Sequence, residues 1–547
     1  MMVQMTFFRN RRSIRPSFFV LLLTLLVTPA AAQVVPAPGV DVYAQSEHER
    51  YLRTLQLRAG VPHHPWSIRS FSRNQVNLLL PRDSLHPWAA RYPAPDLQRR
   101  RAGFGLVAPR GKIIYNSSFP FGYDGGPEWA GRGVTTVAQA GFQAHAGPLS
   151  LVFAPIAFRA ENARFVLYPT QNEAQRFRDP LWPQHIDLPQ RFGEGAYARV
   201  DLGESSLRFD LPVVTVGLST ARQHWGPMVE YPLLMGTGSG GFPHGFVGTG
   251  SPLNIGIGRV HAKLISGRIG QSEFSPFPGD VGARLASGLV AVFSPRFLDG
   301  LEVGGGRFYH QVWPAGGPDA GDLLRPLEGL LKSGLDEGDA DPANQVAGVF
   351  ARWVFPRSGL EFYGEFIRED HAWDLRHFLL EPEDLSGYGF GVARVWERDN
   401  GNLRQLRVEV MNGENATRGR AFHGGMILNR MYTHSQATQG HTNRGQLLAA
   451  REAFGGAGLA FTVDEYDRSG RTSVSLSRTQ RLSEVRDPEI PHLPPVDVMH
   501  SVGVERLLFR GRYEATTGVT GTYEMNRNFQ DDAFNLHLVL QLRAVLR

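Results

Sequence analysis

Apolar and polar residues alternate strictly through most of the chain, from about Gly105 onward. The clearest case is NLHLVLQLRAVLR, residues 535–547, in which leucines fill one face and Asn, His, Gln and Arg fill the other. A period of two is typical of a β-strand with one apolar and one polar face. The same pattern recurs in LRFDL, LEFYGEF, LRVEV and SVSLS, which begin at Leu207, Leu360, Leu406 and Ser473. The sequence therefore predicts an all-β protein.

Two architectures use such strands. A soluble sandwich buries the apolar face, whereas a transmembrane barrel turns it toward lipid and keeps a polar lumen. Strand segments of about ten residues suit a tilted crossing of the bilayer, and charged residues lie on the face opposite the apolar one. About 440 residues at roughly 20 to 28 per strand give about 16 to 20 strands. We therefore expect a large antiparallel transmembrane β-barrel over residues 105–547, although many such barrels end on an aromatic residue and this one ends on Arg547.

The first residues have the pattern of an export signal. Four arginines precede a ten-residue apolar run, Phe18–Val27, and the small-residue sequence TPAAAQ follows it. A basic flank, a short apolar core and an Ala-x-Ala site are typical of a secretory signal, here residues 1–32 with cleavage near Ala32. A membrane-spanning helix would need about 20 apolar residues. We expect export and localisation in the outer membrane.

Residues 33–104 follow a helical rather than a two-residue period. Ser46 and Glu49 form a capping-box pattern at the start of ERYLRTLQLRAG, whose apolar residues cluster on one side until Gly60. Two short segments broken by proline follow. Two or three short helices are expected over residues 41–102, with Trp66 and Trp88 packed against something. Such a segment before a polar-lumen barrel looks like a plug.

Charge and composition exclude several functions. The formal net charge is +5, but the signal holds four arginines and no acid, so the mature chain is close to neutral and no nucleic-acid partner is expected. There are no cysteines, hence no disulfide or thiolate metal site. His224, His244 and His261 fit no metal-binding helix face, and we expect no metal and no cofactor. Arginine dominates the positive charge, either through genomic bias or because guanidinium groups fork onto acidic glycans or lipopolysaccharide.

The stretch TARQHWGPMVEYPLLMGTGSGGFPHGFVG, residues 220–248, breaks the alternation. Glycines, aromatic rings and histidines gather in a loop after a regular strand. Sugar binding uses aromatic faces, planar polar groups and, for charged sugars, arginine. Girdle aromatics and turn glycines are the alternative explanation. The candidate polysaccharide-binding residues are Arg222, His224, Trp225, Tyr231 and His244 in this loop, Tyr123, Trp129 and Arg132 in YDGGPEWAGRG, and Tyr432 and Arg444 further along.

Three segments resemble the capsule assembly Wzi family of bacterial outer-membrane proteins. They are NSSFPFGYDGGPEWAGRGVTT (116–136), HWGPMVEYPLLMGTGSGGFPH (224–244) and RMYTHSQATQGHTNRGQLLA (430–449). In the third, the usual Tyr-Thr-His-Arg-Gly order is altered to His441-Thr442-Asn443-Arg444-Gly445. The resemblance implies a barrel of about 18 strands, with small N-terminal helices at its periplasmic end and a lectin-like rather than catalytic activity.

The sequence as a whole thus predicts an outer-membrane barrel that binds capsular polysaccharide or exopolysaccharide. Its other expected partners are outer-membrane lipid, lipopolysaccharide and, during biogenesis, the barrel-assembly machinery. A transport porin is the main alternative. An outer-membrane hydrolase ranks third, because the serine of GTGSG (236–240) lacks the strand-turn-helix context of a nucleophile elbow and no His-Glu-x-x-His motif appears.

Overall fold

The structure is a computed structural model. It describes residues 42–58, 61, 63–79, 86–92, 102–122, 126–170, 172–180, 182–236, 238–276, 283–327, 343–369, 375–380, 382–383, 385–414, 431–434, 436–481 and 496–545. The predicted signal sequence and Tyr123 lie outside these residues. Among the described residues, no helix has the length and apolar character needed to cross a membrane.

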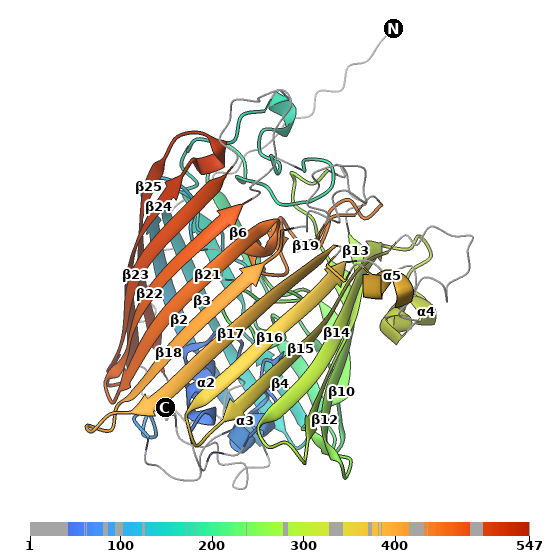
Figure 1. The fold of residues 1–547 in the computed structure, drawn as a ribbon, viewed down its shortest axis with the longest axis vertical. Coiled ribbons are helices and arrows are strands. Elements are labelled where there is room, and N and C mark those ends of the chain that lie inside the picture. The colour runs from blue at the N-terminus through green and yellow to red at the C-terminus, as the bar shows by residue number, and fades with distance from the viewer. Residues whose placement is uncertain are drawn as a thin grey trace. The chain divides into compact units, whose positions relative to one another are not determined.

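Within the described part of the chain, 18 antiparallel strands close into a barrel (Figure 1). Three of the barrel strands are interrupted and comprise the pairs β4/β5, β6/β7 and β10/β11. The ladder closes where β2 pairs with β25, as Ile113 opposite Leu540 illustrates. This confirms the predicted barrel. The bounds are β2 (Ala102–Asn116), β3 (Gly133–Ala146), β4 (Leu149–Phe153), β5 (Ile156–Ala160), β6 (Tyr197–Asp201), β7 (Ser206–Asp210), β8 (Val214–Ser219), β10 (His244–Thr249), β11 (Leu253–Asn254), β12 (Gly258–Ile269), β13 (Arg284–Pro295), β14 (Leu301–Val312), β15 (Asn344–Phe355), β16 (Leu360–Glu369), β17 (Ser386–Glu397), β18 (Leu403–Asn412), β21 (Gly456–Asp467), β22 (Gly470–Arg481), β23 (Asp497–Arg510), β24 (Tyr513–Met525) and β25 (Ala533–Ala544).

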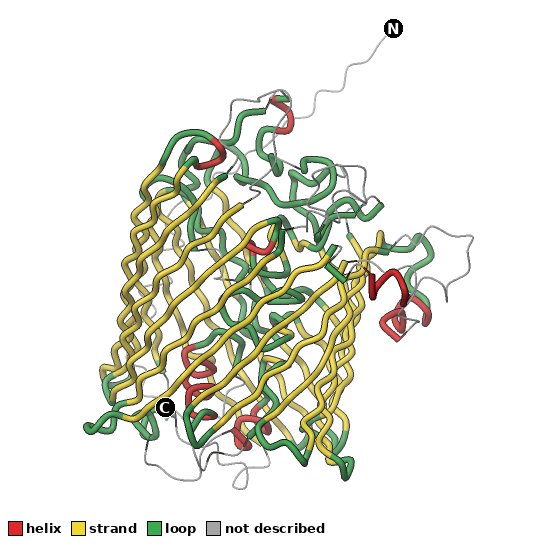
Figure 2. The backbone as a smooth tube through the Cα atoms, in the orientation of Figure 1, coloured by secondary structure: helices red, strands yellow, loops and turns green. Residues whose placement is uncertain are grey.

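The remaining elements are short and lie between or beside the barrel strands (Figure 2). They are α2 (Glu47–Gln56), β1 (Ile68–Arg69), α3 (Arg73–Leu79), η2 (Glu173–Gln175), β9 (His224–Trp225), α4 (Ala320–Leu324), η3 (Arg325–Leu327), α5 (Leu375–Leu380), β19 (Thr442–Asn443), β20 (Gln446–Leu447), η5 (Arg451–Ala453) and η6 (Arg527–Phe529).

The strands turn their apolar side chains outward and their polar side chains into the barrel. On β25, Leu540 and Leu542 are half exposed on the outer face, whereas Asn535 and His537 are buried inside. This orientation is the reverse of a soluble protein and matches a barrel with a lipid-facing wall. The prediction that the apolar faces point outward and the polar faces point into the barrel is therefore confirmed.

The two ends of the barrel differ in the length of their connections. At one end, which we call the short-turn end, the strands are joined by the brief segments 147–148, 211–213, 255–257, 296–300, 356–359, 398–402, 468–469 and 511–512. At the other, the long-loop end, the connections include 161–196, 220–243 and 413–455. Short turns face the periplasm and long loops face outward in outer-membrane barrels.

Exposed aromatic side chains mark both ends of the outer wall, as expected for girdles at the two membrane interfaces. Those near the short-turn end are Phe104, Phe153, Phe209 and Trp353, and those near the long-loop end are Tyr115, Tyr388, Tyr523 and Phe534.

The N-terminal segment, of which residues 42–58, 61, 63–79 and 86–92 are described, lies inside the barrel at the short-turn end, with α2 and α3 visible there (Figure 1). Its first helix, α2, begins as predicted at Ser46, whose side chain accepts a hydrogen bond from the Glu49 amide. The Glu49 carboxylate bonds the Gln45 amide, one residue before the position that a capping box uses. Trp88 is buried and donates from its indole to the carbonyl oxygen of Asp467, beside a short turn between barrel strands.

Candidate functional site

The loop 220–243 turns down into the barrel and meets the N-terminal segment there. Its two-residue strand β9 pairs antiparallel with β1, so that Ile68 lies opposite Trp225 and Arg69 opposite His224. The Arg69 guanidinium donates to the carbonyl oxygens of Gly226 and Met228, at 2.7 Å each. Two segments that enter from opposite ends of the barrel therefore form one continuous plug.

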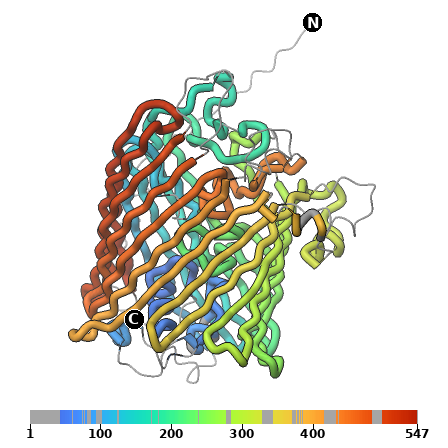
Figure 3. The backbone as a smooth tube through the Cα atoms, viewed as in Figure 1, coloured from blue at the N-terminus to red at the C-terminus, as the bar shows by residue number. Residues whose placement is uncertain are grey.

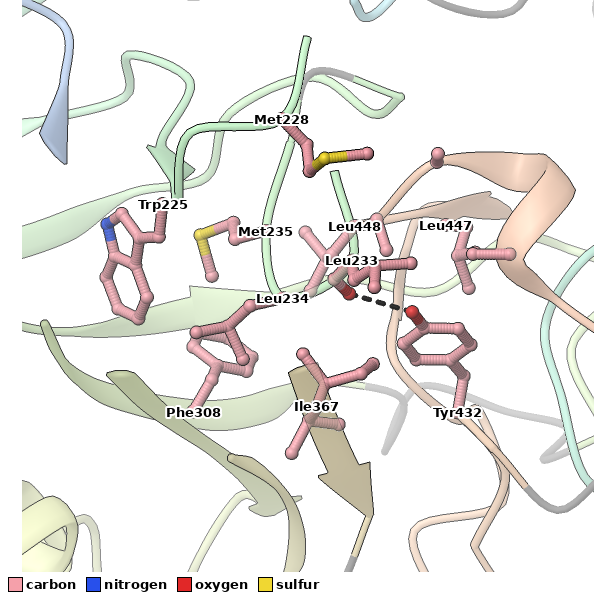
Figure 4. Packing of buried hydrophobic residues seen from close by; sticks show 14 of the residues in the cluster. Trp225, Met228, Leu233, Leu234, Met235, Phe308, Ile367, Tyr432, Leu447 and Leu448 are labelled. Atoms are coloured by element: carbon pink, nitrogen blue, oxygen red, sulfur yellow. Dashed lines mark hydrogen bonds between the residues drawn. The ribbon is translucent and has the colours of Figure 1, made fainter. Parts of the chain in front are cut away.

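Apolar side chains of this loop form the centre of a hydrophobic core inside the barrel. Trp225, Met228, Leu233 and Leu234 have at most 1% of their surface exposed. They pack against inward-facing residues of the wall such as Phe308 (Figure 4). Burying several large apolar side chains at about 1.5–3 kcal/mol each is a substantial stabilisation, so this part of the lumen is a packed interior and not a water-filled channel.

Glycines in the wall make room for the plug. A Cβ atom at Gly288 would lie 2.6 Å from Cη2 of Trp225, closer than real atoms approach. A Cβ atom at Gly458 would lie 2.7 Å from Cζ of Tyr231. The absence of a side chain at these two inward positions is therefore what lets the two aromatic rings reach the barrel wall.

Buried glutamates of the wall hold the plug by its backbone. Glu365 on β16 accepts hydrogen bonds from the amides of Met228 and Leu233, at 2.9 and 3.0 Å. Glu409 on β18 accepts from the amides of Val229 and Glu230, at 2.9 and 2.8 Å. These four amides lie outside any helix or strand, so a side-chain carboxyl acceptor satisfies donors that would otherwise be costly to bury.

The same arrangement fixes the N-terminal segment. Glu302 on β14 accepts from the Trp66 amide and the Ser67 hydroxyl, both at 2.7 Å. Arg53 on α2 forms an ion pair with Glu361 of β16 at 3.0 Å and donates to the carbonyl oxygen of Pro227 in the loop. One arginine thus links the helix, the wall and the loop.

A third segment, residues 431–454, closes over the loop. The Tyr432 hydroxyl donates to the carbonyl oxygen of Leu233 at 2.7 Å, drawn in Figure 4, and the His441 ring donates from Nε2 to that of Leu234 at 2.9 Å. The two rings stack with centroids 5.5 Å apart. Burial lowers the pKa of His441 to about 4, so the ring is neutral at neutral pH.

Most of the candidate polysaccharide-binding residues are inside the protein. The side chains of His224, Trp225, Tyr231, His244, Trp129 and Tyr432 are all buried, with 0–4% of their surface exposed. Neighbouring side chains cover these rings, so the rings contribute to the packing of the protein interior. Arg132, Arg222 and Arg444 keep accessible surface. The role of these candidates in binding polysaccharide stays a prediction, and the accessible arginines are the members placed to reach a ligand directly.

The accessible candidates are anchored by neighbouring groups. Arg222 pairs with Glu204 at 2.5 Å, and Arg444 pairs with Asp201 at 2.7 Å. Arg132 donates to the carbonyl oxygen of Ser117. The structure therefore does not bring the nine described candidates together at one surface: it divides them between buried positions and separate accessible positions along the barrel interior and mouth, and Tyr123 lies outside the described residues.

A long connection, residues 161–196, crosses the long-loop end, and we call it the cap segment (Figure 3). The Asp187 amide donates to the carbonyl oxygen of Gln439, and Ser272 donates from its amide to the Asp187 carboxylate. From the opposite side, Gln530 donates to the carbonyl oxygen of Leu167. The cap segment is therefore tied to loops from several parts of the barrel.

Three arginines of the cap segment surround a single carboxylate. Arg164, Arg176 and Arg191 lie 3.2, 2.6 and 3.8 Å from Glu194. The Arg164 side chain is 83% exposed and that of Arg176 is 42% exposed. The Arg191 guanidinium lies 5.9 Å from the ring of Phe177. This cluster, Arg164/Arg176/Arg191/Glu194, gives the long-loop end a basic surface with aromatic neighbours.

The sequence reasoning did not find this cluster. Its three arginines are 12 and 15 residues apart and follow no motif. The available signal was compositional, because the 36 residues between β5 and β6 lack alternation and contain several arginines and phenylalanines.

Comparison with known proteins places the fold. No family model matches the chain, and no curated protein matches it by sequence. Among solved structures, it is similar to Wzi of Escherichia coli, an outer membrane protein involved in group 1 capsule assembly and described as a carbohydrate-binding β-barrel. The TM-score is 0.62 at 14% identity, over 92% of this chain and 99% of that one. The chain has the Wzi fold. The family resemblance in the sequence is confirmed at this level.

Porins are also similar, at lower scores. OprD of Pseudomonas aeruginosa gives a TM-score of 0.36 at 8% identity, over 82% of this chain and 94% of that one. A BenF-like porin of Pseudomonas fluorescens gives 0.38 at 9% identity, over 81% and 99%. At these scores the porins add nothing to the assignment, which rests on the Wzi fold.

Proposed function

We propose that the protein is a lectin-like outer-membrane barrel that binds capsular polysaccharide or exopolysaccharide at the cell surface and helps to retain or assemble it. Two observations together carry the proposal: the filled lumen and the exposed arginines at the long-loop end. Packed side chains fill the lumen around Trp225 and Leu234, while the long-loop end presents exposed arginines beside aromatic rings. A barrel filled in this way is poorly suited to diffusion, and its usable surface is the outward one.

The Wzi of Escherichia coli, named as a carbohydrate-binding barrel, supports the same function through the shared fold. Planar guanidinium groups donate in pairs to hydroxyls and carboxylates, which suits them to glycans. We infer that Arg164 and Arg176 contact the polysaccharide, with Arg132 beside them, because Arg132 also donates to the carbonyl oxygen of Arg164. The protein reaches the outer membrane after removal of a signal peptide near Ala32.

The chain offers a matched control for this proposal. At the short-turn end, Arg398 and Arg404 share the carboxylate of Glu465, as Arg164 and Arg176 share that of Glu194. In each, two arginines with accessible side chains share one glutamate, and the cap-segment cluster contains Arg191 in addition. The two sites lie at opposite ends of the barrel. Loss of charge alone affects both alike, whereas binding at the outer surface depends on one.

The experiment compares Arg164→Ala/Arg176→Ala with Arg398→Ala/Arg404→Ala in cell-surface retention of polysaccharide. We expect the first pair to weaken binding about tenfold or more, since 1.4 kcal/mol is a factor of ten, and the second to leave it unchanged. Heat-modifiable gel mobility reports that both barrels are folded. Equal retention by the two folded variants would remove the cap segment from the binding surface.

A further inference from the structure

One sector of the outer wall is polar where it should meet lipid. On the parts of β13–β16 nearest the long-loop end, several outward positions are polar and no more than 9% exposed. They are Ser287, Arg307, Tyr309, Gln311, Gln345 and Arg368. Their outward direction follows from the alternation, because Phe308, between Arg307 and Tyr309, packs into the core inside the barrel. Arginine facing lipid is destabilising, so a covering layer is needed here.

A short segment supplies this cover. Residues 319–327, comprising α4 and η3 and here called the outer flap, lie outside the barrel against β13 and β14 (Figures 1 and 2). Arg307 donates to the carbonyl oxygen of Pro326 at 3.2 Å, and Gln311 donates to the Asp322 carboxylate at 2.6 Å. Asp319 and Asp322 form a capping box that fixes the start of α4. The flap therefore supplies hydrogen-bond acceptors to Arg307 and Gln311 of the wall beneath it.

The other side of the flap is apolar and exposed. Leu323, Leu324 and Leu327 have 37%, 46% and 62% of their surface accessible. Helix α5, which follows β16 at the same end of the barrel, also carries exposed leucines, Leu379 and Leu380, at 68% and 54%. Polar contacts toward the barrel and leucines away from it are the pattern of an interfacial amphipathic segment.

The leucines continue the lipid-facing surface of the barrel. Further down the same strands, Val303 and Val349 face outward and are 38% and 61% exposed, as a membrane-facing wall requires. Arg368 pairs across the sheet with Ser386, two residues above the exposed girdle residue Tyr388. The flap thus stands at the level of the outer membrane interface, directly above the apolar band.

We propose that the outer flap is a lipid-binding surface whose leucines insert among the acyl chains of the outer leaflet. In this sector the membrane contacts the flap instead of the strands, and the polar layer between flap and wall is sealed from lipid. The partner is defined by its chemistry. Hydrocarbon chains of lipid contact the leucine side chains at the depth of the exposed aromatic residues near the long-loop end. This contact is separate from polysaccharide binding.

The test uses the absence of native cysteine, which allows a single spin label at any chosen position. The full-length variants Leu324→Cys and Leu327→Cys are labelled with a nitroxide and reconstituted in phospholipid vesicles. Val349→Cys serves as the membrane reference on β15, and Val166→Cys as the aqueous reference in the cap segment, since both side chains are exposed. Power-saturation measurements compare collisions with oxygen, which concentrates in lipid, and with a water-soluble nickel chelate.

We expect the labels at positions 324 and 327 to collide with oxygen as the label at 349 does, and to be protected from nickel. Nickel collisions like those at 166 would overturn the proposal. Dipolar broadening between labels at 324 that is abolished by dilution with unlabelled protein would assign the leucines to a second copy of the chain and also overturn it. Heat-modifiable mobility checks that each variant is a folded barrel.

Discussion

Two walls of the same barrel face the lumen with different chemistry. The wall formed by β13–β18 carries buried glutamates, large apolar side chains and glycines that admit the plug. The wall formed by β22–β25 carries small or polar residues at mid-height, and their side chains keep accessible surface inside the barrel: Ser475, Ser477, Glu505, Thr520 and Gln541. At mid-height the first wall is a docking surface for the loop 220–243, whereas the second keeps accessible polar side chains. Near the short-turn end the second wall also holds the N-terminal segment, through the pairs Arg91–Glu514 and Glu47–Arg471.

The difference shows that alternation alone does not decide what a lumen does. Both walls obey the same outward pattern, as Phe362 on β16 and Val502 on β23 illustrate, each half exposed to the exterior. Below the level of the outer flap, only the inward positions differ, in volume and in charge. A plug held along one wall by carboxylate-to-amide bonds is anchored asymmetrically, and that asymmetry can be tested.

Removing the plug should have the largest effect. We expect deletion of residues 42–92 together with replacement of 220–243 by a two-residue turn to open an ion-conducting pore in planar bilayers, because barrels of 16–18 strands leave an aqueous channel when empty. The turn is feasible because Ser219 and His244 are paired neighbours on β8 and β10. Deleting 42–92 alone should conduct less, since the loop core remains.

The full-length protein is the control and should conduct negligibly. Porin-like conductance by the intact chain would favour the transport alternative, and a silent double deletion that is still a folded barrel would contradict the plug.

Glu365→Ala should weaken the attachment of the loop 220–243 to the wall formed by β13–β18. The amides of Met228 and Leu233 would lose their acceptor in a buried site, and at about 1–3 kcal/mol for each unsatisfied donor the free energy of unfolding should fall by about 2–6 kcal/mol. Ser475→Ala, at an accessible inward position of β22, should change the free energy of unfolding by less than about 0.5 kcal/mol. Urea titration of the refolded barrels measures both. Similar values for the two variants would show that the walls do not differ in this way.

A pair of glycines gives a finer comparison. Gly288→Ala places a Cβ 2.6 Å from Trp225, whereas Gly518→Ala on β24 places one 3.6 Å from Val539, which is ordinary contact. We expect the first to cost about 1–3 kcal/mol through overpacking and the second to be close to neutral. Their thermal midpoints, measured side by side, decide the matter, and a neutral Gly288→Ala would mean that Trp225 can move without cost.

Lowering the pH should slightly reduce the free energy of unfolding, through protonation of His441. His441 has a folded-state pKa of about 4, below its unfolded value of about 6.5, so the unfolded chain binds the proton more readily. Stability therefore falls as pH drops from 6.5 toward 4, by about 1 kcal/mol at pH 5.5. His441→Gln should reduce the fall in that part of the pH profile of unfolding by about this amount, while other buried histidines such as His64, whose pKa burial also lowers to about 4, keep their contribution. An unchanged profile would locate the dependence elsewhere.

The barrel was predictable from the sequence because every strand repeats one local rule. Within residues 535–547 the alternation assigns each leucine to one face of the strand, and many other short segments follow the same rule. The N-terminal helix was predictable for a similar reason, since Ser46 and the spacing of Leu52 and Leu55 are local signals.

The interior of the site was not predictable in that way. Trp225 in a Gly-rich loop has the composition of a binding surface, and only its approach to Gly288 and Phe308, far along the chain, shows that the ring is buried. The cap-segment cluster depends likewise on how Arg164, Arg176 and Glu194 meet after folding. Long-range packing has no periodicity to reveal it.

The contacts of the N-terminal segment have a consequence for assembly. Arg53 pairs with Glu361, 308 residues later, and Arg91 pairs with Glu514, 423 residues later. Contacts of such high sequence separation form slowly, because the intervening chain must be ordered first. The N-terminal segment, although it is synthesised before the barrel strands, is therefore expected to be among the last parts to reach its final environment. Its docking would then report that a barrel has been completed.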